Sequence, residues 1–469
     1  MTGTATTAPA LSERQRLAAF GAVACATVVA ATDAIAISVA LPAIAADFGA
    51  AAAATTWVVA APQIVIVTML LLFATVADSR GHRRVFIASL GLVLLATPLC
   101  ILAGSLQELV LARILQSFGV AGIMAINFAL LRRIFPPANL GRAAGMVATV
   151  VAIAFTLGPA LAGLLLAVGS WRLVFVALMP LVAIALLAGW RWLPPDTPAS
   201  APVNPLSLVA SMVLPAGLLV ALGALAHGWP AAWGLAGLGL AAVGAGLLVA
   251  AQRVPGRKVF PVDLLAIPAF GLSILASVCI FTAQFLSFIV LPFHLSLTLG
   301  FDAVTTGLVL CAWPAAVACV APFTGRLSDR VSAGPLELSG LTLFAVGLTL
   351  LAFLPDDAGP LEVAARMALC GAGFAGFQSP NNRVMMLSVP PERGGAGGGT
   401  MASARQFGMA AGTTLAALVL SMAGAGPDGL GAEASTVPGL RLPMTVAVCL
   451  ILAGMAALIL RRRAMARGW

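Results

Sequence analysis

A single carboxylate stands inside an otherwise apolar run, and its position suits it to carry a proton. Asp33 lies within residues 17–42, a stretch of about 25 residues, which is enough to cross a bilayer as a helix. A charge at that depth costs roughly 2.5–3.5 kcal/mol on insertion scales, so an intramembrane acid normally faces protein or water and has a function. The remaining members of the 16 acidic residues fall in predicted loops or at the ends of predicted spans. We expect Asp33 to take up and release a proton; the alternative is a carboxylate that only holds helices together.

Arg113 is the counter-charge that we expect beside Asp33. It lies about five residues, or 8 Å, below one end of its predicted span, whereas Asp33 lies about sixteen residues, or 24 Å, from the opposite end of its own. In a hydrocarbon core about 30 Å thick, the two residues are therefore at similar depth. The alternative is an arginine whose side chain only extends to the headgroups.

A glycine–proline pair interrupts a later apolar run at the same depth. Gly158 and Pro159, followed by Gly163, lie within residues 142–168. Proline leaves a backbone carbonyl without its helical partner, and small residues let helices approach closely. A gating element and a simple packing kink both fit this pattern.

A charged loop follows the second predicted span at residues 78–84, and residues 325–330 repeat its pattern in the second half of the chain. Its glycine allows a tight turn, and its charges can pair with neighbouring helix ends. We predict that the loop governs conformational change; a generic basic loop is the alternative. The residues assigned to this role are Asp78, Gly81, Arg83, Arg84, Asp329 and Arg330.

Neutral polar side chains at intermediate depth are candidates for lining a substrate cavity. Gln284 occupies roughly the position of Asp33 in the second half, so we expect proton chemistry in one half only. With one acid that is already compensated by an arginine, the second charge of a dication would find no partner, which favours neutral or monovalent amphipathic substrates. The candidate cavity residues are Gln63, Gln116, Asn127, Gln284, Gln378, Asn381 and Asn382.

The composition sets the class of protein that must position these residues. The chain has 469 residues, of which 61% are hydrophobic and 9% charged, whereas a soluble domain carries about 25% charged residues. This predicts an all-α polytopic membrane protein. The net charge of +9 is too sparse for a nucleic-acid surface and is explained by arginines at span ends. The seven cysteines form no ligand or disulfide pattern, and no nucleophile, zinc or nucleotide motif is present. We therefore expect no enzyme, no metal and no bound cofactor.

Apolar runs predict fourteen transmembrane helices. Lysine and arginine gather in alternate connections, which predicts that both termini are cytoplasmic. A cleaved signal peptide is the rival reading of the first run, but its apolar core should span only about 7–15 residues. The predicted helices are 17–41, 55–77, 84–104, 108–131, 142–168, 172–193, 206–226, 231–251, 267–291, 304–325, 335–354, 361–387, 397–422 and 441–463.

An internal repeat divides these helices into two units. Residues 135–145 resemble residues 389–399, and Asn127 corresponds to Asn381. Two copies of a six-helix unit around a central cavity are typical of secondary transporters. We predict an N-terminal bundle over residues 1–193, a linker with two inserted helices over residues 194–258, and a C-terminal bundle over residues 259–469.

Taken in order, these motifs resemble the major facilitator superfamily, specifically its fourteen-span drug:proton antiporters. The resemblance covers nearly the whole chain. The first-span pattern D-x-T-[IV]-[VI]-N-[VI]-A-L-P falls at residues 33–42, the charged loop at 74–84, R-x-x-Q-G at 113–117 and the antiporter G-P at Gly158 and Pro159. The chain departs from these patterns at Ala74, Ile35, Ser38, Ser117 and Leu178. The resemblance implies the major facilitator fold, with two six-helix bundles and two inserted helices.

The function that the resemblance implies is export of small amphipathic or lipophilic compounds, driven by the proton gradient. Its partners would be the small-molecule substrate, protons and the lipid bilayer, and we expect a monomer in the bacterial cytoplasmic membrane. An exporter dedicated to one metabolite or lipid is an alternative. A non-transporting sensor or an intramembrane enzyme is a more distant one, because no nucleophile and base or metal set accompanies Asp33.

Overall fold

The computed structural model describes residues 12–135, 140–196, 204–226, 229–254, 259, 262–328, 330–390, 393–422 and 439–466, and the regular elements in them are helices. The first group comprises α1 (Glu13–Phe48), α2 (Ala52–Thr55), α3 (Trp57–Arg80), α4 (His82–Leu102), α5 (Leu106–Ile134), α6 (Leu140–Val168) and α7 (Arg172–Trp192). Two helices follow, α8 (Pro205–Ala226) and α9 (Ala231–Ala251). The last group comprises α10 (Val262–Leu265), α11 (Pro268–Leu297), α12 (Ala303–Leu310), α13 (Ala312–Ser328), α14 (Ala333–Ala352), α15 (Pro360–Leu387), α16 (Gly394–Met422) and α17 (Arg441–Ala466).

The ends of α1 follow from local chemistry. Ser12 caps its N-terminus: the Ser12 hydroxyl accepts from the Gln15 backbone N–H, and the Gln15 side chain accepts from the Ser12 backbone N–H. Gly49 ends the helix with φ 57°, a left-handed conformation that suits glycine. The helix between these caps has 36 residues and runs along most of the length of the bundle. Asp33 lies in its interior.

Two predicted spans are each divided into two helices. The segment predicted at 304–325 breaks at Cys311 between α12 and α13, because Pro314 has no N–H to donate to the Leu310 carbonyl. The segment predicted at 55–77 breaks at Thr56 between α2 and α3. A long helix nevertheless lies at each of the fourteen predicted segments.

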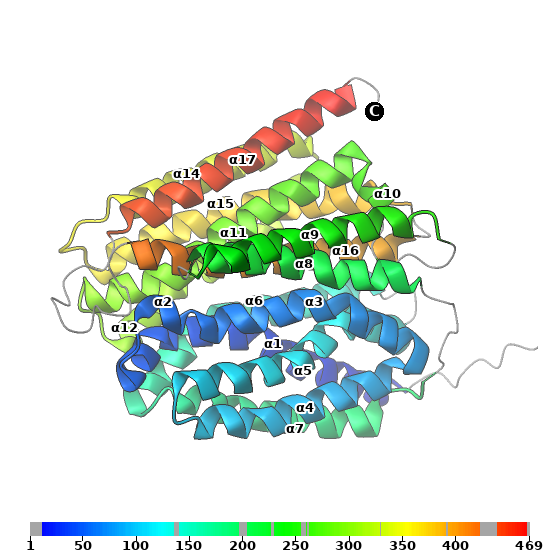
Figure 1. The fold of residues 1–469 in the computed structure, drawn as a ribbon, viewed down its shortest axis with the longest axis horizontal. Helices are drawn as coiled ribbons and strands as arrows, with labels where there is room; N and C mark the ends of the chain where they lie inside the picture. Colours follow the sequence, from blue (N-terminus) through cyan, green and yellow to red (C-terminus); the bar gives the residue numbers. More distant parts are fainter. Residues whose placement is uncertain are drawn as a thin grey trace, which may run out of the picture.

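The first and last groups of helices have the same internal packing. In the first half (α1–α7), α1 packs against α6 and α7, and α5 packs against α3 and α4. In the second half (α10–α17), α11 packs against α16 and α17, and α15 packs against α13 and α14. Figure 1 shows the two halves as layers, the first below and the second above. The repeated sequence is therefore matched by repeated packing.

Helices α8 and α9 lie against each other, and α8 contacts both α3 of the first half and α16 of the second. In Figure 1 this green pair crosses the front of the boundary between the halves. Twelve helices of the described residues are long and apolar enough to cross a membrane, and α15 and α16 are not among them. The chain is a polytopic, all-helical membrane protein.

We distinguish the two ends of the helical bundle by where the chain termini lie. The terminal end, on the right in Figure 1, is where α1 begins and α17 ends; the far end is where α12 begins. The halves meet closely toward the far end, where α6 packs against α12.

Candidate functional site

Asp33 of α1 and Arg113 of α5 form a buried ion pair. The Arg113 Nη1 lies 2.6 Å from the Asp33 Oδ1, and the two side chains are 2% and 8% exposed. The second carboxylate oxygen, Oδ2, accepts no hydrogen bond from the residues that the structure describes. The structure thus brings together the two residues that depth alone had matched, and it leaves one oxygen of the acid unbonded.

The guanidinium makes two further hydrogen bonds, and one of the two acceptors is itself held in place. Arg113 Nη1 donates to the Gln116 Oε1 at 2.5 Å, and Gln116 Nε2 donates to the Thr97 hydroxyl at 2.9 Å. Arg113 Nε donates to the Val58 carbonyl at 3.3 Å. That carbonyl is available because Pro62, four residues later, has no N–H to offer it. Gln116, expected in the cavity, instead orients the arginine.

Helix α6 lies between the Asp33 region and the second half. A Cβ on Gly158 would lie 3.5 Å from Thr32 Cγ2, one residue before Asp33. On the α12 side, a Cβ on Gly163 would lie 2.4 Å from the Ala303 carbonyl oxygen, and one on Gly307 would lie 2.4 Å from the Pro159 carbonyl oxygen. Only glycine at 163 permits this backbone approach. The glycine–proline segment is therefore part of the contact between the halves.

The charged loop turns at Gly81, whose φ is 108°. Asp196, in the segment after α7, accepts from the backbone N–H groups of Arg83 at 2.8 Å and Arg84 at 3.1 Å. It also pairs with Arg133 at 3.0 Å. Asp196 thus caps the N-terminus of α4, satisfying N–H groups that the helix leaves without partners.

Asp196 falls in the linker predicted over residues 194–258, where the sequence indicated no role for it. The only sequence feature that could have pointed to a role for Asp196 is that it is a carboxylate among prolines shortly after a predicted span. Within the loop, the His82 Nε2 lies 3.3 Å from the Asp78 Oδ1. Arg330 is exposed, and Asp329 lies outside the described residues.

The residues expected to line a cavity fall into two groups: those whose side chains hydrogen-bond to other helices and those whose side chains do not. Gln63 accepts from Gln406 Nε2 of α16 at 3.5 Å, and Asn127 Nδ2 donates to the Thr27 hydroxyl at 2.8 Å. Asn381 is 1% exposed, with Nδ2 donating to the Ser277 hydroxyl at 2.8 Å, so it lies inside the second half. Three side chains are partly exposed and make no hydrogen bond with the described part of the chain: Gln284, Gln378 and Asn382.

Glu337 of α14 is a second buried acid, although it lies near the end of a span as the sequence predicts. Glu337 is 0% exposed and pairs with Arg461 of α17, which is 2% exposed. Arg461 Nη1 also donates to the Ser273 hydroxyl at 2.7 Å. Its burial was not anticipated, because sequence cannot distinguish a solvated span end from a buried one.

Arg405 of α16 is a second residue that the sequence analysis left without a role. Its guanidinium carbon lies 5.2 Å from the centroid of the Phe281 ring on α11. It has no ion-pair partner among the described residues, and its Nε is buried without a hydrogen-bond acceptor.

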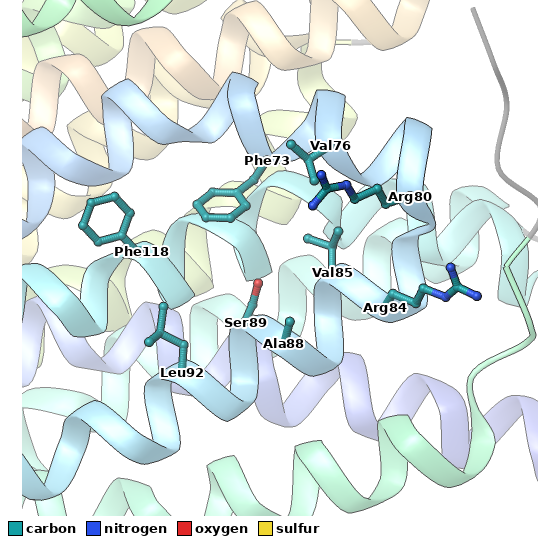
Figure 2. A pocket seen from close by; sticks show the side chains of 9 residues that line it. All are labelled: Phe73, Val76, Arg80, Arg84, Val85, Ala88, Ser89, Leu92 and Phe118. Carbon is teal, nitrogen blue, oxygen red and sulfur yellow. The ribbon is translucent and has the colours of Figure 1, made fainter.

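A hollow of about 370 Å³ lies near the terminal end of the first half. Figure 2 shows Arg80 and Arg84 at one end of it and Phe118 and Leu92 at the other, with Phe73 between. All of its lining residues come from α3, α4 and α5, so this hollow adjoins the charged loop and is not formed between the halves.

Comparisons with known proteins agree on one family. The sequence model described as Major Facilitator Superfamily matches residues 23–413 and again residues 273–467. The uncharacterized transporter YebQ of Escherichia coli K12 is 41% identical over 397 residues, covering 84% of this chain and 87% of its own. The multidrug resistance protein Stp of Mycobacterium tuberculosis is 29% identical over 398 residues, covering 83% and 73%.

Among solved structures, a bacterial homologue of the human lysosomal transporter Spinster, in an inward-facing and unoccupied conformation, has a TM-score of 0.72. It is 17% identical and covers 97% of this chain and 99% of its own, so the similarity concerns the fold.

Proposed function

The chain belongs to the major facilitator superfamily, and from that premise we propose that it exports small amphipathic or lipophilic compounds in exchange for protons. It is a transport protein and not an enzyme. The observation that carries the proposal is the buried Asp33–Arg113 pair, which places a titratable group inside the first span. No bound cofactor is needed, because the proton gradient supplies the driving force.

The chemistry of the pair supports proton exchange. With Asp33 ionised, Arg113 has its counter-charge, and the pair is neutral inside a low-dielectric bundle. A proton arriving at the unbonded Oδ2 removes that counter-charge and leaves Arg113 with neutral neighbours, namely Gln116, the Val58 carbonyl and the Phe175 ring. A buried cation without a counter-ion is costly, so protonation should favour a rearrangement of α1 against α5.

Helix α6 supplies a route from this rearrangement to the second half. Gly158 packs beside Thr32 on α1, whereas Gly163 packs against Ala303 on α12. A shift of α1 at Asp33 would therefore change the surface on which α6 rests, and with it the far-end contact between the halves. We propose that this contact opens and closes during transport.

The topology and location belong to the same proposal. We place all fourteen long helices across the cytoplasmic membrane of a bacterium, with both termini cytoplasmic, so that the terminal end faces the cytoplasm. The bundles would comprise residues 1–193 and 259–469, with the inserted helices at 194–258, in a monomer. The arginines at the terminal end, among them Arg80, Arg84 and Arg133, support this orientation.

The breadth of substrates is proposed from the relatives. Stp is named for multidrug resistance, which supports amphipathic drugs as substrates, while an exporter of one metabolite or lipid is the alternative. A competition screen separates the two, since a dedicated exporter should be inhibited by a narrow set of compounds only.

Everted membrane vesicles from a host that lacks its own exporters test the proposal. On addition of a respiratory substrate, vesicles that contain this protein should accumulate a fluorescent amphipath, and collapse of the pH gradient should release it. Accumulation that persists after the gradient is collapsed would contradict proton coupling.

A further inference from the structure

Arg405 is a cation inside the helical bundle for which the described residues provide no counter-ion. Arg113 and Arg461 are paired with Asp33 and Glu337, whereas Arg405 has, within the described part of the chain, the face of Phe281, 5.2 Å from its guanidinium carbon. Its Nε is buried and makes no hydrogen bond with the residues that the structure describes. An uncompensated cation at such a depth is costly, and residues of this kind commonly mark the path of a substrate or an ion.

Arg405 lies on the side of α16 that faces the interior of the protein. Gly408 and Gly412 follow it by three and seven residues, so the three share one side of α16. That side rests on α11, since a Cβ on Gly408 would lie 2.8 Å from Phe281 Cβ and one on Gly412 would lie 2.4 Å from the Thr282 carbonyl oxygen. Phe281 itself is 7% exposed. The guanidinium therefore does not face the lipid side of α16.

The next residue places Arg405 at the seam between the halves. Gln406 reaches Gln63 of α3 at 3.5 Å and the Met124 sulfur of α5 at 3.8 Å, both in the first half. Helix α16 is enclosed by α11, α3 and α8. Arg405 is still partly exposed, and it lies on α16 between α11 and the helices of the first half.

A neutral polar group accompanies the cation. Gln284 follows Phe281 by three residues on the same side of α11, is partly exposed, and makes no hydrogen bond with the described residues. On the opposite side of the seam, the Asp33 carboxylate is already bound to Arg113. A solute entering here would meet an unpaired cation and an amide, and the acid would be occupied.

We propose that Arg405 binds the negatively charged group of the exported compound, so that the favoured substrates are amphipathic anions such as carboxylates. The guanidinium and the Gln284 amide donate to the oxyanion. This inference rests on the proposed function and names its substrate class. It revises the expectation from sequence, which considered the acid and its partner but not this second cation.

A matched series of fluorescent probes tests the charge preference by equilibrium binding. Pyrenebutanoate, pyrenebutanamide and pyrenebutylamine share one apolar body and differ in the charge of the head group. The full chain in lipid nanodiscs, without any gradient, should bind the carboxylate about ten-fold more tightly than the amide, as expected for a hydrogen bond to a charged group. The amine should bind most weakly. Equal affinities, or a preference for the amine, would overturn the proposal.

Three variants assign any preference to Arg405. Arg405→Gln should weaken carboxylate binding to the level of the amide and leave amide binding unchanged, while Arg405→Lys should retain most of the preference. Arg441→Gln is the matched control, because Arg441 also stacks on a phenylalanine, Phe353, with its guanidinium carbon 5.5 Å from the ring centroid, at the start of α17. Equal loss of carboxylate and amide binding in Arg405→Gln, or loss of the preference in Arg405→Lys, would contradict recognition of charge.

The binding assay separates this inference from the proposed function. A carboxylate preference that depends on Arg405, in a protein without gradient-driven transport, supports the inference and contradicts proton-coupled export. Gradient-driven export of the amide without any carboxylate preference contradicts the inference alone.

Discussion

Gly163 of α6 lies so close to Ala303 of α12 that a Cβ on the glycine would fall 2.4 Å from the alanine carbonyl oxygen. A branched side chain at 163 cannot fit without separating the helices, and overpacking of this kind costs about 1–3 kcal/mol. Gly163→Val should therefore shift the protein away from the state that is closed at the far end.

Spin labels at Ser170 and Asp357, in far-end connections of the two halves, measure this shift as a longer distance distribution in a cysteine-free background. Gly158→Ala is the control, since its Cβ would meet Thr32 at 3.5 Å, an ordinary contact. An unchanged distribution in Gly163→Val would show that the far-end contact does not determine the conformation.

Asp196 should matter for turnover, because it caps α4 beside the charged loop and pairs with Arg133. Asp196→Ala removes both interactions and should lower stability by about 1 kcal/mol through the lost cap, with slower transport. Asp196→Asn keeps one acceptor oxygen, which can serve the Arg83 N–H, but its Nδ2 cannot accept from the Arg84 N–H and the charge pair with Arg133 is lost. Its thermal unfolding should therefore fall between that of the unmodified protein and that of Asp196→Ala.

Asn204→Ala provides the comparison for a lost cap elsewhere, because Asn204 accepts from the Leu206 and Ser207 N–H groups at the start of α8. Thermal unfolding and initial transport rates are measured for all three variants. If Asn204→Ala slows transport as much as Asp196→Ala does, the loop has no special part in the conformational change.

The interior of the second half should depend on the Glu337–Arg461 pair. Glu337→Gln leaves Arg461 charged and buried without a counter-ion, beside the neutral amide, Ser273 and Asn381, and loss of one charge of a buried pair costs about 3–5 kcal/mol. The double variant Glu337→Leu with Arg461→Met removes both charges and should recover most of that loss. Chemical unfolding in detergent micelles measures both. A double variant less stable than Glu337→Gln would mean that the pair itself stabilises the bundle.

The sequence could identify residues whose depth or motif is distinctive, but not the faces of helices that are apolar all round. Asp33 and Arg113 were paired by depth, and the repeat anticipated that α11 would pack as α1 does. Gln116 and Asn381 looked like cavity residues, yet they hold Arg113 and Ser277. Asp196, Glu337, Gln406 and Arg405 were missed because their partners come from distant helices, and period cannot orient a helix that lacks a polar stripe.

The central claim is that Asp33 couples transport to protons, and uphill transport in proteoliposomes tests it most directly. The full chain is reconstituted, a pH gradient is imposed, and accumulation of a fluorescent amphipath is compared with exchange of the same compound at equal pH. Asp33→Asn keeps the volume of the side chain and removes the titratable group. Glu362→Gln is the control, since Glu362 is a partly exposed acid that pairs with Arg366 in the first turn of α15. We predict that Asp33→Asn abolishes accumulation but retains exchange, while Glu362→Gln retains both; undiminished gradient-driven accumulation by Asp33→Asn would contradict the account.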